Sequence, residues 1–209
     1  MSPVKAIKTF RDMLSFFTII PLGATEDFIV TTAEHVFLFP LIGAFIGLLG
    51  ATYFLASGFV TSYILLLINS LIQVPTELLQ KLIPAIMTMA FLLVLTGLQH
   101  FDGLVDLGNA IGLGNLEERR AAAHRWVVSY KGATLAIVVE FLALLGLVFL
   151  NGATAFLLII VSEVGAKLAM VTIAAVGKPT HRGLGIRAHC PAPGPRPHRR
   201  RRPRASATG

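Results

Sequence analysis

An uncharged apolar block runs from Val36 to Val74 and constrains the fold more strongly than any other part of the chain. The block is 39 residues long, whereas a helix needs only about 20 apolar residues to cross a bilayer. Ser57 and Gly58 lie near its middle, where small residues favour a break. We therefore predict two membrane spans in this block, at roughly 36–56 and 59–74.

Three more apolar runs follow, at residues 82–98, 133–150 and 152–176. We expect a short polar connection at 75–81, and Asn151-Gly152 is a strong turn signal between the last two runs. Because lipid offers the backbone no hydrogen-bond partner and the runs are continuous rather than alternating, the spans are predicted to be helices. The sequence thus predicts an all-α, polytopic transmembrane helical bundle of about five spans, with a polar region at 99–131.

Composition excludes an ordinary soluble domain. Hydrophobic residues make up 55% of the chain and charged residues only 14%, against about 25% charged residues in a typical soluble protein. So much apolar surface requires lipid as its solvent, and we expect a multi-pass protein of the cell (plasma) membrane. The apolar stretch 13–22 is too short to span and lacks a small-residue cleavage site. It is expected to lie in the membrane interface or to re-enter.

The excess of positive charge belongs to the carboxyl-terminal end. From Gly177 onward the chain carries nine Lys and Arg residues and no acid, whereas residues 1–176 carry nine basic and eleven acidic residues. We expect one membrane domain over 1–186 and a basic Pro/Arg-rich tail over 187–209 that is disordered or comes from a shifted reading frame. No nucleic-acid partner is expected, and the sequence leaves the oligomeric state open, a homo-oligomer included.

Two basic clusters raise a question of topology. Both clusters favour the cytoplasmic side: Lys5, Lys8 and Arg11 near the amino terminus, and Arg119, Arg120, Arg125 and Lys131 in the polar region. Three complete spans between the clusters would place them on opposite sides of the membrane. We therefore expect that one run between 36 and 98 does not fully cross, or that the 13–22 segment takes a larger part in crossing.

The polar region contains a pair of acids that favours metal binding. Asp102 and Asp106 are two of only four aspartates in the chain, and on a helix they would share one face, with Asn109 one turn further along. Neighbouring carboxylates repel each other unless a cation binds between them, and magnesium prefers carboxylate oxygens together with water and substrate phosphate. We predict Asp102, Asp106 and Asn109 as Mg²⁺ ligands; a pair of solvated acids is the alternative.

Residues beside the acids suggest a site for a phosphate-bearing substrate. Gly97, Gly103 and Gly108 would let a bulky substrate approach the backbone closely. His100 is predicted to act as a general base or as a hydrogen-bond donor to phosphate, with an interface residue as the alternative.

Further charged residues lie beyond this segment. Residues 117–126 are predicted to form an amphipathic surface helix. Arg125 and Lys131 are predicted to neutralise substrate phosphates; the alternative is a solvated helix without a role in binding. Inside the last span, Glu163 and Lys167 are spaced to pair on one helix face. Such a pair is either structural or lines a polar pocket.

The segment His100-Phe101-Asp102-Gly103-Leu104-Val105-Asp106, preceded by Leu95-Thr96-Gly97, resembles the signature of the cobalamin 5'-phosphate synthases, or adenosylcobinamide-GDP ribazoletransferases. Other pieces agree in order: Phe16-Phe17-Thr18-Ile19-Ile20-Pro21, Phe39-Pro40-Leu41-Ile42-Gly43 with Gly47, Glu117 to Arg120, Lys131-Gly132-Ala133, and Gly183-Leu184-Gly185. The resemblance covers about residues 5–186.

This resemblance implies a polytopic membrane enzyme of cobalamin biosynthesis that requires Mg²⁺. Members of the family transfer α-ribazole or its 5'-phosphate onto adenosylcobinamide-GDP with release of GMP, giving adenosylcobalamin or its 5'-phosphate. Carried onto this chain, the resemblance implies His100, Asp102 and Asp106 as catalytic residues. It also implies a set of residues that contact the substrates: Gly97, Gly103, Asn109, Arg125, Lys131 and Gly132.

The chain departs from the family pattern in three places. Asn109 stands where the family often has a third aspartate, and Val127-Val128-Ser129 stands where an aspartate usually precedes the glycine segment. The family also continues with further spans beyond Gly183-Leu184-Gly185, so we expect an incomplete fold here.

Two other functions stay open. A CDP-alcohol phosphotransferase also sets aspartates around a glycine at a membrane face, although its longer four-aspartate pattern is absent here. In a transporter or membrane scaffold, the function would instead fall to Glu140, Glu163 and Lys167.

Overall fold

The computed structural model describes residues 3–23, 32, 34–123 and 127–177, and within these ranges the secondary structure is helical throughout. Four helices are long and apolar enough to cross a membrane: Val36–Asn69, which joins the 3-10 turn η1 (Val36–Leu38) to α3 (Phe39–Asn69), α4 (Thr76–Leu95), α7 (Tyr130–Phe149) and α8 (Gly152–Val176). The predicted all-α polytopic bundle is confirmed, with four such helices in the described part instead of about five. The tail 187–209 lies outside the described residues.

The break predicted near Gly58 is wrong, because α3 continues through it as one helix. Ser57 Oγ donates to Phe54 O at 3.0 Å, so this hydroxyl is satisfied within the helix. A glycine inside a helix costs only about 1 kcal/mol relative to alanine, less than the unpaired backbone groups that a break would expose to lipid. The 31 residues of α3 span about 46 Å, which exceeds the roughly 30 Å hydrocarbon core.

The prediction of a polar connection over 75–81 is also wrong for most of these residues, which are helical. Helix α4 begins at Thr76 and contains Pro84, since Thr76 to Lys81 includes strong helix formers such as Glu and Leu. The helix ends at Leu95, and the backbone then turns through Gly97 and Leu98, whose φ angles are +62° and +61°. This left-handed turn, uncommon for leucine, directs the chain into the next helix.

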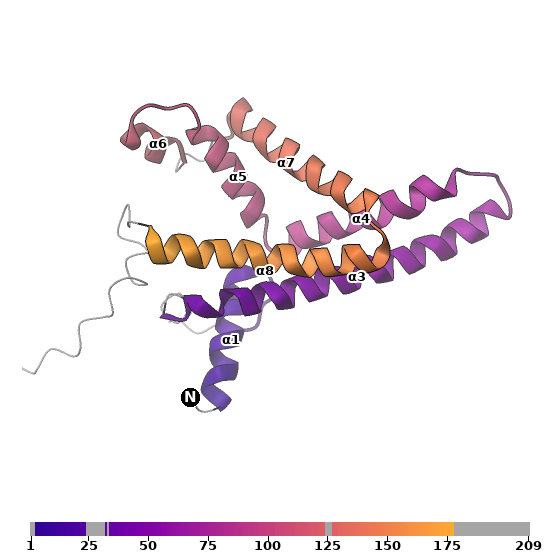
Figure 1. The fold of residues 1–209 in the computed structure, drawn as a ribbon, viewed down its shortest axis with the longest axis horizontal. Helices are drawn as coiled ribbons and strands as arrows, with labels where there is room; N and C mark the ends of the chain where they lie inside the picture. The colour runs from indigo at the N-terminus through magenta and orange to yellow at the C-terminus, as the bar shows by residue number, and fades with distance from the viewer. Residues whose placement is uncertain (1–2, 24–31, 33, 124–126, 178–209) are drawn as a thin grey trace, which may run out of the picture.

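The hairpin of α7 and α8 confirms the turn predicted at Asn151-Gly152. Asn151 is the N-cap of α8, and its side-chain oxygen accepts a hydrogen bond from Thr154 N at 2.9 Å. Such a cap satisfies one of the free amides at a helix start. The two helices therefore return the chain to the end of the bundle where α7 began (Figure 1).

The number of candidate spans bears on the question of topology. With α3 and α4 as only two crossings, α1 (Pro3–Phe17), α5 (Gln99–Ala110) and α6 (Leu116–Ala123) all lie at one end of the bundle (Figure 1). The α3–α4 and α7–α8 connections lie toward the other end. The described residues of the two basic clusters therefore lie at the same end, as positive charges flanking membrane spans tend to do.

Helix α1 runs across the bundle end rather than along it (Figure 1). Its buried residues Met13, Leu14 and Phe17 pack with Phe39 of α3 and Leu95 of α4. The first part of the 13–22 stretch is thus the end of an amphipathic helix that packs on the bundle.

Glycines allow α3 and α8 to approach each other closely. A Cβ at Gly43 would lie 2.6 Å from the backbone oxygen of Glu163, and one at Gly47 would lie 2.7 Å from Ile160 Cα. Small residues spaced four apart are typical of tightly packed membrane helices. Alongside them Ala51 and Ala155 are completely buried, so this seam is the centre of the bundle.

A side chain at Gly47 should therefore weaken the bundle. We expect Gly47→Val to lower the free energy of unfolding by about 1–3 kcal/mol, as overpacking does, measured as a lower thermal midpoint in detergent. Gly165→Val is the matched control, because a Cβ at Gly165 of α8 meets nothing within 4 Å. Equal midpoints for the two variants would contradict the packing described for this seam.

Candidate functional site

The acid pair lies on a helix, as its spacing required. Asp102 and Asp106 belong to α5, one turn apart, and at 100° per residue their directions differ by about 40°. Asp102 is exposed and Asp106 is half-buried. Among the described residues, no hydrogen bond or ion pair engages either carboxylate. Both therefore have oxygens free to bind a ligand.

This pair fits the way magnesium is held beside a substrate phosphate. Magnesium usually keeps several waters and takes one or two protein carboxylates, with phosphate oxygens completing the shell. Within the described residues, no group of three or more His, Cys, Asp or Glu side chains gathers to form an all-protein metal cluster. Asp102 and Asp106 are thus suited to a metal shared with a ligand rather than to a closed structural site.

Asn109, the predicted third ligand, is engaged elsewhere. Its Oδ1 accepts hydrogen bonds from Ser129 N at 3.1 Å and Ser129 Oγ at 2.5 Å. Its Nδ2 donates to Val127 O at 2.9 Å. An amide oxygen has two lone pairs, and both are used here. Metal ligation by Asn109 stays a prediction that would require the release of a bond from Ser129.

The same network begins α7. Ser129 is the N-cap of that helix, and its Oγ accepts from Gly132 N at 3.1 Å. Gly132 and Gly108 allow α5 and α7 to approach closely, since a Cβ at Gly108 would lie 2.6 Å from Gly132 Cα. The geometry therefore gives Gly132 a packing role, and substrate contact by Gly132 stays a prediction.

His100 points away from the acid pair. Around the α5 axis it lies about 160° from Asp102 and about 120° from Asp106. Its Nε2 lies 3.0 Å from Lys167 Nζ of α8; a charged lysine can only donate, and Nε2 is then the acceptor of this contact. Burial, and then the charge of Lys167, lowers the pKa of His100. A direct catalytic role for His100 stays a prediction.

Other predicted substrate residues lie around α5. Gly103 faces open space, where a Cβ would meet nothing within 4 Å, whereas a Cβ at Gly97 would lie 3.1 Å from Ile19. Lys131, in the first turn of α7, is exposed. Arg125 lies outside the described residues. The predicted surface helix at 117–126 is present as α6, Leu116–Ala123.

A large cleft opens between α4, α5, α7 and α8, with a volume of about 890 Å³. Its walls are mostly apolar, with polar groups from His100, Glu140, Ser162 and Glu163. Asp102 and Asp106 do not line it. Helix α5 thus presents one face to this cleft, and its two carboxylates lie on another face.

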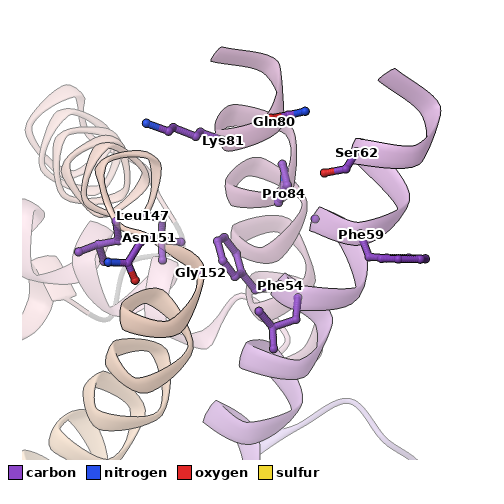
Figure 2. A pocket seen from close by; sticks show the side chains of 12 residues that line it. Phe54, Phe59, Ser62, Gln80, Lys81, Pro84, Leu147, Asn151 and Gly152 are labelled. Atoms are coloured by element: carbon purple, nitrogen blue, oxygen red, sulfur yellow. The ribbon is translucent and has the colours of Figure 1, made fainter. Parts of the chain in front are cut away.

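A second, smaller cleft of about 390 Å³ lies toward the opposite end (Figure 2). Phe54 and Ser62 of α3, Gln80 and Lys81 of α4, and Asn151 line it. Lys81 is the charged residue of this lining, and no carboxylate accompanies it. The acid pair and this cleft are therefore separate features of the bundle.

Two side-chain contacts could not be predicted from the sequence, although each involves a residue that the sequence analysis named for another reason. Ser129 was treated as part of a departure from the family pattern, yet it binds Asn109. Lys167 was expected to pair with Glu163, and their charged groups do lie 3.8 Å apart, but the bond to His100 joins residues 67 positions apart. A lysine within an apolar run was the available signal.

Comparison with known proteins gives a consistent family. The family described as Cobalamin-5-phosphate synthase matches residues 9–195. Three curated relatives carry the name adenosylcobinamide-GDP ribazoletransferase. The protein of Methanococcoides burtonii is 28% identical over 84% of this chain and 62% of its own length. That of Methanosarcina mazei is 30% identical over 84% of this chain and 63% of its own length. That of Halorubrum lacusprofundi is 32% identical over 86% of this chain and 66% of its own length. The chain thus spans somewhat less than two thirds of these relatives. No solved structure matches it.

The Asn109–Ser129 contact should be measurable as a coupling energy. We expect Asn109→Ala and Ser129→Ala each to destabilise the fold, and the double variant to be less destabilised than their sum by about 1 kcal/mol, because the two side chains share hydrogen bonds. Unfolding of the purified protein in detergent gives the three free energies. Strict additivity would show that the contact contributes nothing.

Proposed function

Because the chain belongs to the cobalamin-5-phosphate synthase family, we propose that it transfers α-ribazole, or its 5'-phosphate, onto adenosylcobinamide-GDP and releases GMP. The product would be adenosylcobalamin or its 5'-phosphate. The names of the relatives support the substrate pair. They favour this reaction over a CDP-alcohol phosphotransferase or a transporter.

One structural observation carries the proposal: Asp102 and Asp106 lie on one face of a helix at the basic end of the bundle, and neither carboxylate has a partner among the residues that the structure describes. Neighbouring carboxylates without a cation repel each other. A cation that binds both carboxylates and a substrate diphosphate would explain why the two acids lie side by side.

In the proposed reaction, an oxygen of a ribose hydroxyl attacks the phosphorus that bears the cobinamide. A new O–P bond forms as the bond from this phosphorus to the bridging oxygen breaks. GMP leaves with that oxygen, and the hydroxyl proton passes to solvent or to a nearby base. Such a transfer depends on positioning and on neutralising the diphosphate charge.

Each residue has a defined part in this proposal. Asp102 and Asp106 would hold Mg²⁺, which neutralises phosphate charge and orients the diphosphate. Lys131 and Arg125 would bind phosphate oxygens from the side of α7 and the connection that precedes it. Gly103, with no neighbour at the position of a side chain, leaves room for the donor to approach α5.

We place this site on the cytoplasmic side of the cell membrane. The basic residues of α1 and α6 lie at the same end as the acid pair (Figure 1), and cytoplasmic flanks of membrane spans are enriched in Lys and Arg. Nucleotide substrates would reach the site from that side.

The acid pair should be essential for turnover. We expect Asp102→Asn and Asp106→Asn each to lower GMP release by at least about 100-fold, since several kcal/mol of transition-state charge stabilisation would be lost. The measurement is GMP formation by the protein in liposomes with adenosylcobinamide-GDP, α-ribazole and Mg²⁺. Chelation of Mg²⁺ should abolish release, and readdition should restore it.

Glu118→Gln, in the exposed helix α6 at the same end, is the matched control and should retain activity. Wild-type GMP release by the double variant Asp102→Asn/Asp106→Asn would refute the proposal. Release of CMP from a CDP-alcohol would instead support the alternative phosphotransferase.

A further inference from the structure

We propose that Lys167 of α8 is a positioning residue for this reaction: it holds the amino-terminal half of α5 through His100 and thereby fixes the direction of Asp102 and Asp106. The inference rests on the proposed function, because the groups that it positions are those assigned there to the diphosphate. Lys167 would itself touch no substrate.

Lys167 is the largest fully buried side chain of the described residues, with 0% of its surface exposed. Its Nζ lies 3.0 Å from His100 Nε2, 3.8 Å from a carboxylate oxygen of Glu163, and 5.0 Å from the ring centre of Phe17. One ammonium thus joins α8 to α5 and α1. The interaction with the aromatic ring adds a favourable contribution of its own.

A buried charge of this kind needs an explanation. Removing an ammonium from water costs several kcal/mol, and well-packed apolar side chains in its place are often as stable or more so. Its nearest acid only partly compensates, because Glu163 Oε2 is buried and makes no hydrogen bond within the described part of the chain. Glu140 of α7 faces the same cleft. Stability alone therefore does not account for Lys167, whereas a role in orienting α5 does.

Helix α5 is held at two points, and the acids lie between them. At its carboxyl-terminal end, Gly108 and Asn109 fix it to α7. At its amino-terminal end, His100 makes a half-buried contact with Lys167, supplemented by an exposed hydrogen bond from Gln99 Nε2 to Phe16 O at 3.2 Å. Without the lysine contact, only the exposed Gln99 bond and the turn from α4 would hold this end of α5.

The turn before α5 makes movement of this end feasible. Gly97 and Leu98 both adopt positive φ angles there, and the regular i to i−4 bonding of α4 gives way to turn bonds, such as Gly97 N to Val94 O and Gln99 N to Thr96 O, before α5 begins. A change of about 1 Å at a reacting group can lower a rate about 100-fold. The bond between Lys167 and His100 is therefore placed where a small loss of restraint would displace both carboxylates.

The experiment compares Lys167→Met with Lys81→Met. Methionine keeps most of the length of lysine and removes its charge, and Lys81 is an exposed lysine near the start of α4 that lines the smaller cleft (Figure 2). We expect Lys167→Met to raise the Mg²⁺ concentration for half-maximal GMP release about tenfold or more, as loss of a ligand-orienting residue does. Lys81→Met should behave as wild type.

A second readout needs no turnover. Mn²⁺ binding in the presence of GDP, followed by electron paramagnetic resonance, should weaken about tenfold in Lys167→Met and stay unchanged in Lys81→Met. Thermal midpoints of both variants in detergent check that the fold is retained. If Lys167→Met does not fold, His100→Leu removes the same contact from the other side.

Variants at His100 separate positioning from direct catalysis. Glutamine can present an acceptor oxygen to Lys167 where histidine presents Nε2, so His100→Gln should lose much less activity and Mn²⁺ affinity than His100→Leu. Wild-type values for Lys167→Met in both assays would overturn the inference. So would equal losses in His100→Gln and His100→Leu with Lys167→Met unaffected, since His100 would then act directly.

Failure of the proposed function gives a different result. In that case Asp102→Asn/Asp106→Asn leaves GMP release unchanged whatever Lys167→Met does. If the acids are essential and Lys167→Met is indistinguishable from wild type, only the positioning role fails.

Discussion

The close contact of α3 with α8 supports the rest of the bundle. Gly43 has no side chain where α8 passes, and a Cβ there would lie 2.6 Å from Glu163 O and 2.9 Å from Lys167 Cγ. This approach turns Glu163 and Lys167 toward the protein interior, away from lipid, where an unpaired charge would be costly. From that position Lys167 reaches His100, so the packing of two spans extends to the helix that carries the acids.

The helical period divides the His100–Asp106 segment between two surfaces. The sequence alone suggests that the histidine and the two aspartates form one catalytic unit. On α5, however, the histidine lines the cleft and contacts α8, while the aspartates lie on another face of the helix, outside the cleft lining. One short helix thereby carries a histidine that contacts α8 and a separate pair of acids that could bind a ligand. Gly103 lies on an open side of this helix, whereas Gly108 packs closely against Gly132.

Much of the fold and part of the site could be predicted from local pattern. The apolar runs gave the all-helical membrane bundle, and Asn151-Gly152 gave the α7–α8 turn. The break predicted at Gly58 was wrong because, in lipid, a continuous backbone hydrogen-bond ladder outweighs the low helix propensity of glycine. Removing that break leaves two crossings between α1 and α5, and so places the basic clusters at one end of the bundle.

The sequence by itself determined the features that depend on residues close together in the chain: membrane helices, the i to i+4 acid pair on one face, and the family. Only the tertiary structure decided which side chains meet. Asn109 binds Ser129, 20 residues away, and Lys167 binds His100, 67 residues away. These pairs depend on where helices cross, and crossings are set by close backbone contacts such as that of Gly108 with Gly132. Local periodicity gives the face that a residue occupies but not the helix that this face will contact.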